Sequence, residues 1–352
     1  MVKLSLNMGG DGTFIGSGEW PDIVANREAY REQGLLPRYL KAPLIGLWEI
    51  TGRCNLRCVY CYNESPRTPP DLEWPIMERL AQEFIKMRIF SACVSGGEPT
   101  LHPRYIDILR LLHEGGISVG TITNGWTMTP ELARSMIRYA GSAQVSLDGP
   151  SAEVHDRVRG RQGSFERAVR AIRLLRDAGF KEVSVSFAAT RLNVDSFPEM
   201  PEFCAALGVA SLRTQPLAMV GRARGETDLE PTPEQTRRQD EFLKASGGKY
   251  GDLKIEWGDP SVHVTIGLGL GMAVAVRITQ NGDFGLTPYY PIYFGNAREA
   301  GLAEVWEQGL RLGWEYEAVR TLLGGAQKCP VLRAQPELEK PLHIAVTAPR
   351  SS

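Results

Sequence analysis

The chain has 352 residues, of which 43% are hydrophobic and 23% are charged, as in ordinary globular proteins. Its 40 Lys and Arg residues nearly balance its 41 Asp and Glu residues, and the formal net charge is −1. This balance excludes the overall basic footprint of a nucleic-acid-binding protein. No apolar run approaches the roughly 20 residues that span a bilayer, and the first residues lack a signal-peptide pattern. We therefore expect a cytoplasmic protein with neither a nucleic-acid nor a membrane partner.

The first two thirds of the chain alternate between strand and helix patterns. Between about Pro43 and Ser246, short apolar runs typical of strands covered on both faces are separated by amphipathic segments. The predicted strands are residues 44–51, 91–95, 118–123, 143–147, 182–188 and 211–216. Helices are predicted over residues 74–86, 105–114, from Ser164 onward, and 195–207. This alternation predicts an α/β fold, a partial (β/α)6 barrel of the TIM type with a parallel sheet.

The pattern changes after about Gly247. Residues 261–268 and 272–279 are predicted as strands, and Asn281-Gly282 after them is typical of a two-residue hairpin turn. A proline- and tyrosine-rich stretch then leads to a predicted helix near residues 302–310. We expect four parts: an extension over residues 1–42 with a helix at 23–33, a core over 43–246, a small α+β domain over 247–334, and a poorly ordered tail over 335–352.

Three of the six cysteines lie on one short loop directly after the first predicted strand, as Cys54-x3-Cys58-x2-Cys61. Three thiolates can bind three irons of a 4Fe-4S cubane and leave the fourth iron open to a reaction partner. Two alternatives stay open. The cysteines could form half of a zinc site, although no fourth Cys or His lies in the loop, or they could be buried apolar residues, although the loop is polar.

This cysteine spacing, with Tyr60 before the last ligand, resembles the signature of the radical S-adenosylmethionine (SAM) superfamily. The resemblance covers roughly residues 43–225 and continues in the family's order. Gly96, Gly97 and Glu98 resemble the GGEP motif that binds the methionine amino group. The remaining matches are Asn124 after the third strand, Ser146 and Asp148 at the ribose-facing fourth strand, and Arg159, which resembles an arginine near the SAM carboxylate.

The resemblance implies a radical SAM enzyme. A 4Fe-4S cluster on Cys54, Cys58 and Cys61 would cleave SAM reductively to a 5′-deoxyadenosyl radical, which takes a hydrogen atom from the substrate. A reducing partner of flavodoxin or ferredoxin type would supply the electron. The matched residues lie at the carboxyl ends of predicted strands, where parallel α/β sheets place active sites.

Three further features concern the substrate or a partner. Gln215, at the end of the sixth strand, is predicted to contact substrate, and Cys329 is a candidate hydrogen-atom donor, as in radical SAM peptide epimerases. Its alternative is a surface thiol without a role. Residues 157–176 hold seven arginines, which form either a solvated helix face or a surface for an anionic partner.

The stretches 277–288 and 302–306 resemble the SPASM domain, which accompanies many peptide-modifying radical SAM enzymes and normally holds auxiliary clusters. Here residues such as Gly267 and Leu286 stand at the cysteine positions, so we predict a SPASM-like scaffold without auxiliary clusters. The resemblance implies modification of a ribosomally made peptide, by cross-linking or epimerisation. Residues 1–42 are too short for a separate peptide-recognition domain, which a partner protein would supply.

Two other functions remain. The chain could be a radical SAM dehydrogenase, epimerase or carbon–carbon bond-forming enzyme for a small molecule in natural-product or cofactor biosynthesis. It could also be a non-catalytic Fe–S or zinc scaffold, against which the SAM motifs argue.

Overall fold

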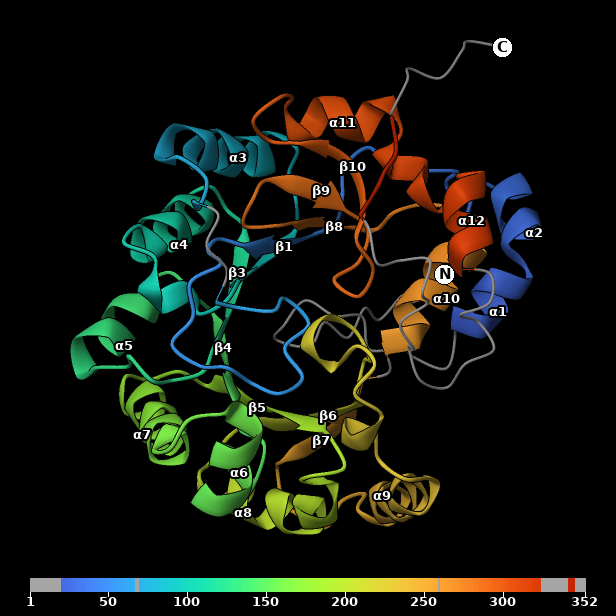
Figure 1. The fold of residues 1–352 in the computed structure, drawn as a ribbon. Coiled ribbons are helices and arrows are strands. Elements are labelled where there is room, and N and C mark those ends of the chain that lie inside the picture. The colour runs from blue at the N-terminus through green and yellow to red at the C-terminus, as the bar shows by residue number, and fades with distance from the viewer. Residues whose placement is uncertain (1–19, 67–69, 259, 324–340, 346–352) are drawn as a thin grey trace.

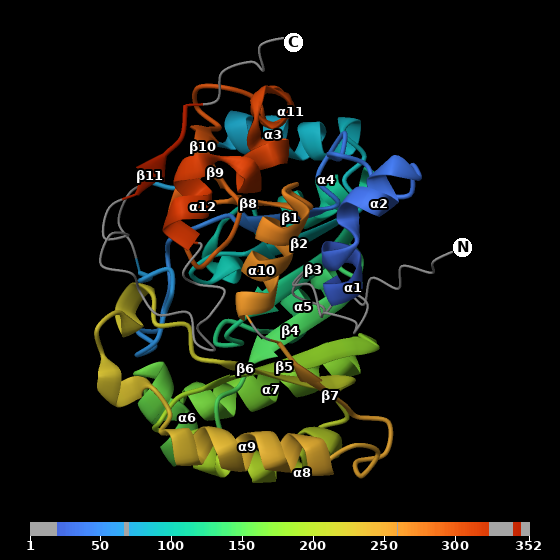
Figure 2. The same ribbon diagram turned by 90° about the vertical axis from the view of Figure 1, so that its right-hand side faces the viewer.

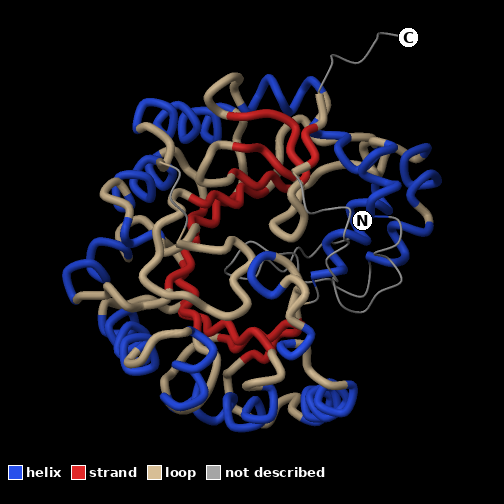
Figure 3. Tube along the Cα trace, viewed as in Figure 1, coloured by secondary structure: helices blue, strands red, loops and turns tan. Residues whose placement is uncertain are grey.

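The computed structural model describes residues 20–66, 70–258, 260–323 and 341–345. Within them, eleven strands form one sheet in the order β11-β10-β9-β8-β1-β2-β3-β4-β5-β6-β7. Figure 3 shows the strands as an open arc with helices on its outer side. The strands are β1 (Ile45–Glu49), β2 (Ser91–Ser95), β3 (Ser118–Thr123), β4 (Ser142–Ser146), β5 (Glu182–Ala189), β6 (Ser211–Pro216), β7 (Lys254–Trp257), β8 (Ala275–Ile278), β9 (Asp283–Gly285), β10 (Ile292–Asn296) and β11 (Leu342–His343).

Helices connect the parallel strands and cover the outer face of the arc (Figure 1). They are α1 (Trp20–Ala25), α2 (Arg27–Glu32), α3 (Trp74–Lys86), α4 (Tyr105–Glu114), α5 (Pro130–Met136), α6 (Ala152–Arg159), α7 (Ser164–Asp177), α8 (Met200–Ala206), α9 (Pro233–Ala245), α10 (Pro260–Leu270), α11 (Leu302–Gln308) and α12 (Glu317–Leu323). Short 3-10 helices are η1 (Pro99–Leu101), η2 (Val194–Glu199), η3 (Gly221–Ala223), η4 (Thr227–Leu229) and η5 (Leu310–Glu315).

The predicted α/β fold with a parallel sheet is confirmed. Strands β1 to β6 occupy the six predicted positions, and β2, β3, β6, α3 and α4 have the predicted bounds. Each of these strands pairs in parallel with its neighbour. Alternating side chains of each strand face the helices or the interior of the arc, so apolar residues on both faces are buried. Among the described residues no helix is both long and apolar enough to cross a membrane.

The prediction of a strand over residues 261–268 was wrong, because this segment lies in α10. Alternating β-branched residues and glycines suggested a strand, but Val264 and Ile266 are buried and apolar residues surround the helix. Its glycines serve close packing. A Cβ atom at Gly267 would lie 2.3 Å from the Trp314 ring, and one at Gly269 would lie 2.5 Å from the Val24 side chain.

The region after α10 continues the barrel sheet. Strand β8 pairs in parallel with β1, with Ile45 opposite Ala275, and the turn at Asn281-Gly282 leads into antiparallel β9, as the hairpin signal predicted. Strand β7, which the sequence did not predict, pairs in parallel with β6 at the other end. Figure 2 shows α10 and α1 on the side of the molecule where the two ends of the arc face each other.

Three smaller expectations differ from the structure. The helix expected over residues 23–33 is divided into α1 and α2, and the helix over 195–207 is η2 followed by α8. Pro198 and Pro201 lack the amide proton that would continue one α-helix through this segment. Within the expected poorly ordered tail, β11 pairs with β10.

Candidate functional site

A cavity of about 220 Å³ lies among the carboxyl ends of the parallel strands and the loop after β1. This loop, residues 50–66, is named the cysteine loop below. The predicted residues that line the cavity are Cys54, Cys58, Tyr60, Cys61, Gly96, Gly97, Glu98, Asn124, Ser146, Arg159 and Gln215. Asp148 is fully buried and contacts two of these side chains from behind. Cys329 lies outside the described residues.

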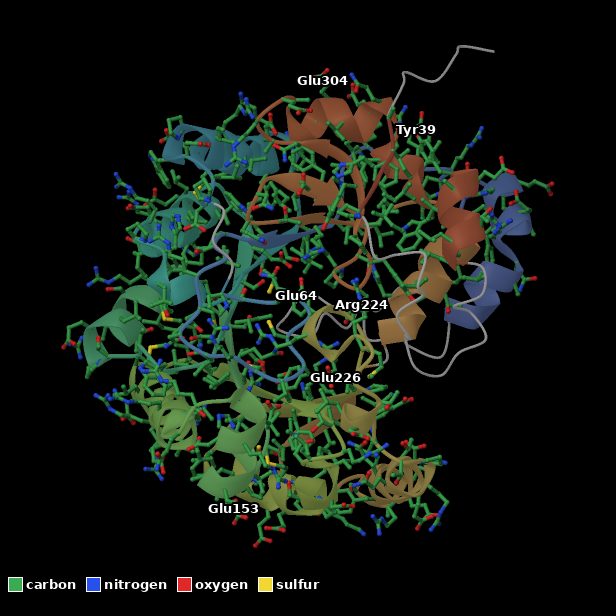
Figure 4. The ribbon with its side chains drawn as sticks, in the orientation of Figure 1. Tyr39, Glu64, Glu153, Arg224, Glu226 and Glu304 are labelled. Atoms are coloured by element: carbon green, nitrogen blue, oxygen red, sulfur yellow. The ribbon has the colours of Figure 1, made fainter. Side chains whose placement is uncertain are left out.

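The cysteine loop is held by Val158 of α6, by Arg161 just after this helix, and by the segment after β6. The Val59 amide donates to the Val158 carbonyl, and the Arg161 side chain donates to the Asn55 carbonyl at 2.6 Å. From the other side, Arg222 donates from Nη1 to the Cys58 carbonyl at 2.7 Å. Figure 4 labels Glu64 in the loop and Arg224 in the segment after β6, the two chain segments joined there. These contacts fix the backbone of the loop before any ligand binds.

The glycines of the Gly96-Gly97 pair are required by packing against the cysteine loop. Gly96 has a φ of +145°, and a Cβ atom there would lie 2.5 Å from the Thr51 carbonyl oxygen. A Cβ atom at Gly97 would lie 2.3 Å from the Arg53 carbonyl oxygen. The structure therefore gives a reason for both glycines in the close approach of two protein backbones.

Glu98 links the ends of β2 and β3. Its buried carboxylate accepts hydrogen bonds from the Thr123 hydroxyl at 2.7 Å, the Thr100 hydroxyl at 2.5 Å and the Asn124 amide at 2.7 Å. Burial raises the pKa of Glu98, and these donors oppose the shift by stabilising the charged form. The Asn124 side chain continues the connection, because its Nδ2 donates to Asn55 Oδ1 at 2.7 Å.

Tyr60, Asp148 and Arg159 form a buried group behind Cys58. The Tyr60 hydroxyl donates to Asp148 Oδ2 at 2.6 Å, and Arg159 Nε lies 2.6 Å from the same oxygen. Arg159 Nη1 also lies 3.6 Å from Cys58 Sγ. Burial lowers the pKa of Arg159 but the Asp148 charge more than offsets it, so the guanidinium stays charged. The arginine predicted to approach the SAM carboxylate is therefore paired with a protein carboxylate and contacts a cysteine.

His155 supports this group in its neutral form. Its Nδ1 accepts a hydrogen bond from the Asp148 amide at 3.0 Å. Burial, with a smaller contribution from the nearby Arg159 charge, lowers the pKa of His155 from 6.5 to about 4. In the unfolded chain the ring binds a proton near pH 6.5.

The His155 contribution to stability is expected to be complete above pH 6.5 and lost as the pH falls from 6.5 to about 4, because the unfolded state binds the extra proton. This amounts to about 3 kcal/mol of unfolding free energy. Urea unfolding of wild type and His155→Asn between pH 7 and 4 should give a difference that shrinks on acidification. His113→Asn, at an exposed position, serves as the control. A pH-independent difference for His155→Asn contradicts the prediction.

In one wall of the cavity, the contacts among Glu49, Tyr62 and Arg277 were not predicted from the sequence. Arg277 of β8 is buried and donates to both carboxylate oxygens of Glu49 at 2.9 and 3.0 Å, and the Tyr62 hydroxyl donates to Glu49 at 3.0 Å. Tyr289 and the predicted Gln215 also line the cavity. Arg277, a charged residue within an apolar strand, was the one sign of this contact in the sequence. Its partner Glu49 lies on β1, and the sequence did not indicate that β8 pairs with β1.

The donor set of the cysteine loop fits an iron–sulfur cluster. Burial raises the pKa of Cys54 to about 12 and also raises that of Cys58, where the Arg159 charge opposes the shift. Because metal binding requires thiolates, loading would release these protons. Within the described ranges no three His, Cys, Asp or Glu side chains converge on a single metal ion. This is compatible with a cubane, in which each thiolate binds a different iron.

Residues 48–204 match the family model described as the radical SAM superfamily. The mycofactocin maturase MftC of Mycolicibacterium smegmatis is 37% identical over 65% of this chain and 57% of its own length. The AdoMet-dependent heme synthase of Methanosarcina barkeri is 28% identical over 76% of this chain and 82% of its own. The antilisterial bacteriocin subtilosin biosynthesis protein AlbA of Bacillus subtilis is 29% identical over 60% and 48%. The match spans little more than half of MftC.

Two solved structures share the fold. SuiB of Streptococcus suis bound to S-adenosylmethionine superposes with a TM-score of 0.66 at 14% identity, covering 93% of this chain and 84% of SuiB. SuiB bound to its precursor peptide SuiA gives a TM-score of 0.65 at 14% identity, covering 88% and 71%. The resemblance to a SPASM domain stays a prediction. Residues 48–204 belong to the radical SAM superfamily, a family that uses a 4Fe-4S cluster and S-adenosylmethionine.

Proposed function

We propose that this chain is a radical SAM enzyme that modifies a peptide within the cavity, with Cys54, Cys58 and Cys61 holding the 4Fe-4S cluster. The observation that carries the proposal is the composition of the cavity. The three cysteines, the motif-bearing strand ends and the Glu49–Tyr62–Arg277 wall all line it. The residues proposed for SAM are those of the motifs: Tyr60, Gly96, Gly97, Glu98, Asn124, Ser146, Asp148 and Arg159.

When bound, the cluster and SAM supply a radical that can abstract a hydrogen atom from an unactivated carbon. The chain's own residues position the reactants. Asp148 and Glu98 hold Arg159 and Asn124 beside the cysteine loop, as their buried contacts indicate.

The Glu49–Tyr62–Arg277 wall is proposed to bind the substrate. Glu49 accepts from Nε and Nη2 of Arg277, and among the described residues Nη1 has no acceptor. Nη1 and the Gln215 amide can therefore bind carbonyl oxygens and an N–H group of a peptide backbone. If the reaction is an epimerisation, Cys329 is proposed to return a hydrogen atom to the substrate radical.

The relatives favour a peptide over a small molecule. AlbA is named for bacteriocin biosynthesis, MftC is named a maturase, and SuiB was solved with a precursor peptide. The heme synthase supports the second candidate, a radical SAM enzyme for a small molecule in cofactor biosynthesis. We also propose that a separate protein recognises the peptide, and that the enzyme is located in the cytoplasm. Neither the cross-link nor the epimerisation is favoured over the other by the cavity.

The substrate class is tested by release of 5′-deoxyadenosine from the anaerobically reconstituted, reduced enzyme. Host lysate is separated by size, and each fraction is supplied before and after protease treatment. We expect the stimulating activity to reside in a fraction that protease destroys, because the proposed wall recognises peptide groups. Stimulation only by small, protease-resistant molecules would overturn the peptide proposal and support the second candidate.

A further inference from the structure

Helix α7 presents a row of exposed arginines that the proposed function does not use. Its buried residues include Ala168, Ile172 and Leu175, which pack toward the sheet. The opposite side carries the arginine face, defined here as Arg167, Arg170, Arg173 and Arg176, all exposed. Figure 1 shows α7 on the outer side of the arc of strands, away from the β8 to β10 region.

The arginine face is strongly positive on a chain that is nearly neutral. Residues 157–177 contain seven arginines against two carboxylates, Glu166 and Asp177, whereas the whole chain has a net charge of −1. Arg170 and Arg173 make no ion pair within the part of the chain that the structure describes. By contrast, Arg237 and Arg238 on α9 pair with Glu234, Glu241 and Asp195. The positive charge of α7 is therefore available to a partner.

A continuous series of contacts joins this face to the cysteine loop. The Arg167 guanidinium lies 5.5 Å from the centre of the Trp126 ring. The Arg161 guanidinium lies 3.6 Å from the centre of the same ring. Arg161 then donates to the carbonyl of Asn55, the residue after Cys54. The arginine face is thus connected, through Trp126 and Arg161, to the residue next to a proposed cluster ligand.

We propose that the arginine face is the docking surface for an acidic redox protein of flavodoxin type that reduces the cluster. This proposal rests on the cluster assignment in the proposed function, but not on the substrate. A redox protein is favoured over an acidic peptide substrate because the face lies outside the barrel, whereas the cavity holds the proposed substrate wall. Opposite charge would orient the donor with its acidic side toward α7 and its electron carrier toward the cysteine loop.

The step is a one-electron transfer without bond making. The anionic flavin hydroquinone of the donor loses one electron and becomes the neutral semiquinone, so no proton is released. The oxidised cluster gains that electron. Because electron transfer slows steeply with distance, a docking surface connected to the cysteine loop through Trp126 and Arg161 favours a short path.

The test compares wild type with Arg170→Glu/Arg173→Glu, both reconstituted, using a purified acidic flavodoxin in its hydroquinone form. The rate constant of cluster reduction at limiting flavodoxin is followed by stopped-flow absorbance. At low ionic strength we expect the double variant to be reduced about tenfold more slowly, since charge complementarity accelerates association by factors of 10 to 1,000. The dissociation constant for oxidised flavodoxin, measured by titration calorimetry, should rise in parallel.

Three controls make the result specific. Arg170→Lys/Arg173→Lys keeps the charge and should keep the rate, and Arg237→Glu/Arg238→Glu makes the same charge change on α9 and should also keep it. Reduction by dithionite, which needs no protein docking, should be equal in all variants. At about 1 M salt, where the Debye length is about 3 Å, the difference from wild type should vanish.

An unchanged reduction rate and an unchanged dissociation constant in the charge-reversed variant would overturn the proposal. Slower reduction by dithionite as well would also overturn it, because the defect would then lie in the cluster. If the variant affects only binding of an acidic peptide, the face serves a substrate and the redox proposal is wrong. A failed cluster assignment would be recognised separately, because wild-type protein would then show no reducible cluster with either reductant.

Discussion

The Asp148→Asn variant is expected to lose about 3–5 kcal/mol of unfolding free energy, because it removes one partner of a buried ion pair. Asp148 is fully buried, its Oδ2 lies 2.6 Å from Arg159 Nε, and Oδ1 accepts from the Ala188 amide at 2.9 Å. The asparagine side chain that replaces the carboxylate can keep part of the hydrogen bonding, but it cannot balance the Arg159 charge. Urea unfolding of the cluster-free protein at pH 7 measures the loss without interference from cofactor loading.

The surface pair between Arg191 and Asp228 provides the matched control. These groups lie 3.6 Å apart, and the Asp228 side chain is 99% exposed. Asp228→Asn is expected to change the unfolding free energy by about 0–1 kcal/mol. A double variant, Asp148→Asn with Arg159→Met, removes the unpaired buried charge and should recover part of the unfolding free energy that Asp148→Asn loses. A loss below about 1 kcal/mol for Asp148→Asn alone would show that Arg159 finds water or another partner there.

The core of the fold could be predicted because its information is local. Strands β1 to β6 are short apolar runs between amphipathic helices, and each run can be recognised from a few consecutive residues. Parallel pairing then follows from the alternation, since a helix between two strands returns the chain in the same direction. The motif residues are local in the same sense, because each follows the end of a strand. That is why nearly all of them line one cavity.

The parts that could not be predicted depend on distant residues. Helix α10 has a β-like sequence, and only the neighbouring Trp314 and Val24 explain its glycines. The pairing of β8 with β1 joins residues more than 200 positions apart, and it creates the buried pair of Arg277 with Glu49. No spacing in the sequence relates these two residues. The Glu49–Arg277 pair was therefore missed, whereas the predicted cysteines, the motif residues and Gln215 lie around one cavity.

The roles of Glu98 and Arg159 show a further limit. Their positions were predicted from the motifs, but their partners were not. Glu98 binds hydroxyl and amide donors of the following loops, and Arg159 pairs with Asp148. A motif locates a residue in the site, whereas the hydrogen bonds that orient it come from elements that fold around it. The carboxylates of Glu98 and Asp148 thus connect the strand ends around the cysteine loop.

The Cys58→Ala variant is expected to lose the cluster and all SAM cleavage. Wild-type protein reconstituted without oxygen should hold about four irons and four sulfides per chain. The variant should hold little of either, because two remaining thiolates cannot fix a cubane. Iron and sulfide analysis and the electron paramagnetic resonance signal of the reduced protein measure the loss directly. 5′-Deoxyadenosine release measures its consequence.

Cys93→Ala is the matched control, because Cys93 is buried in β2 and lines the same cavity but lies outside the cysteine loop. It should keep the iron, the sulfide and SAM cleavage. Unfolding of both cluster-free variants must resemble wild type, so that a missing cluster is not explained by a misfolded chain. A Cys58→Ala protein that still holds four irons would contradict the ligand assignment. Zinc without sulfide in the wild type would instead support a zinc site at the same loop. The cysteine loop thus carries the decisive test, because every other residue of the cavity acts on what these three thiols bind.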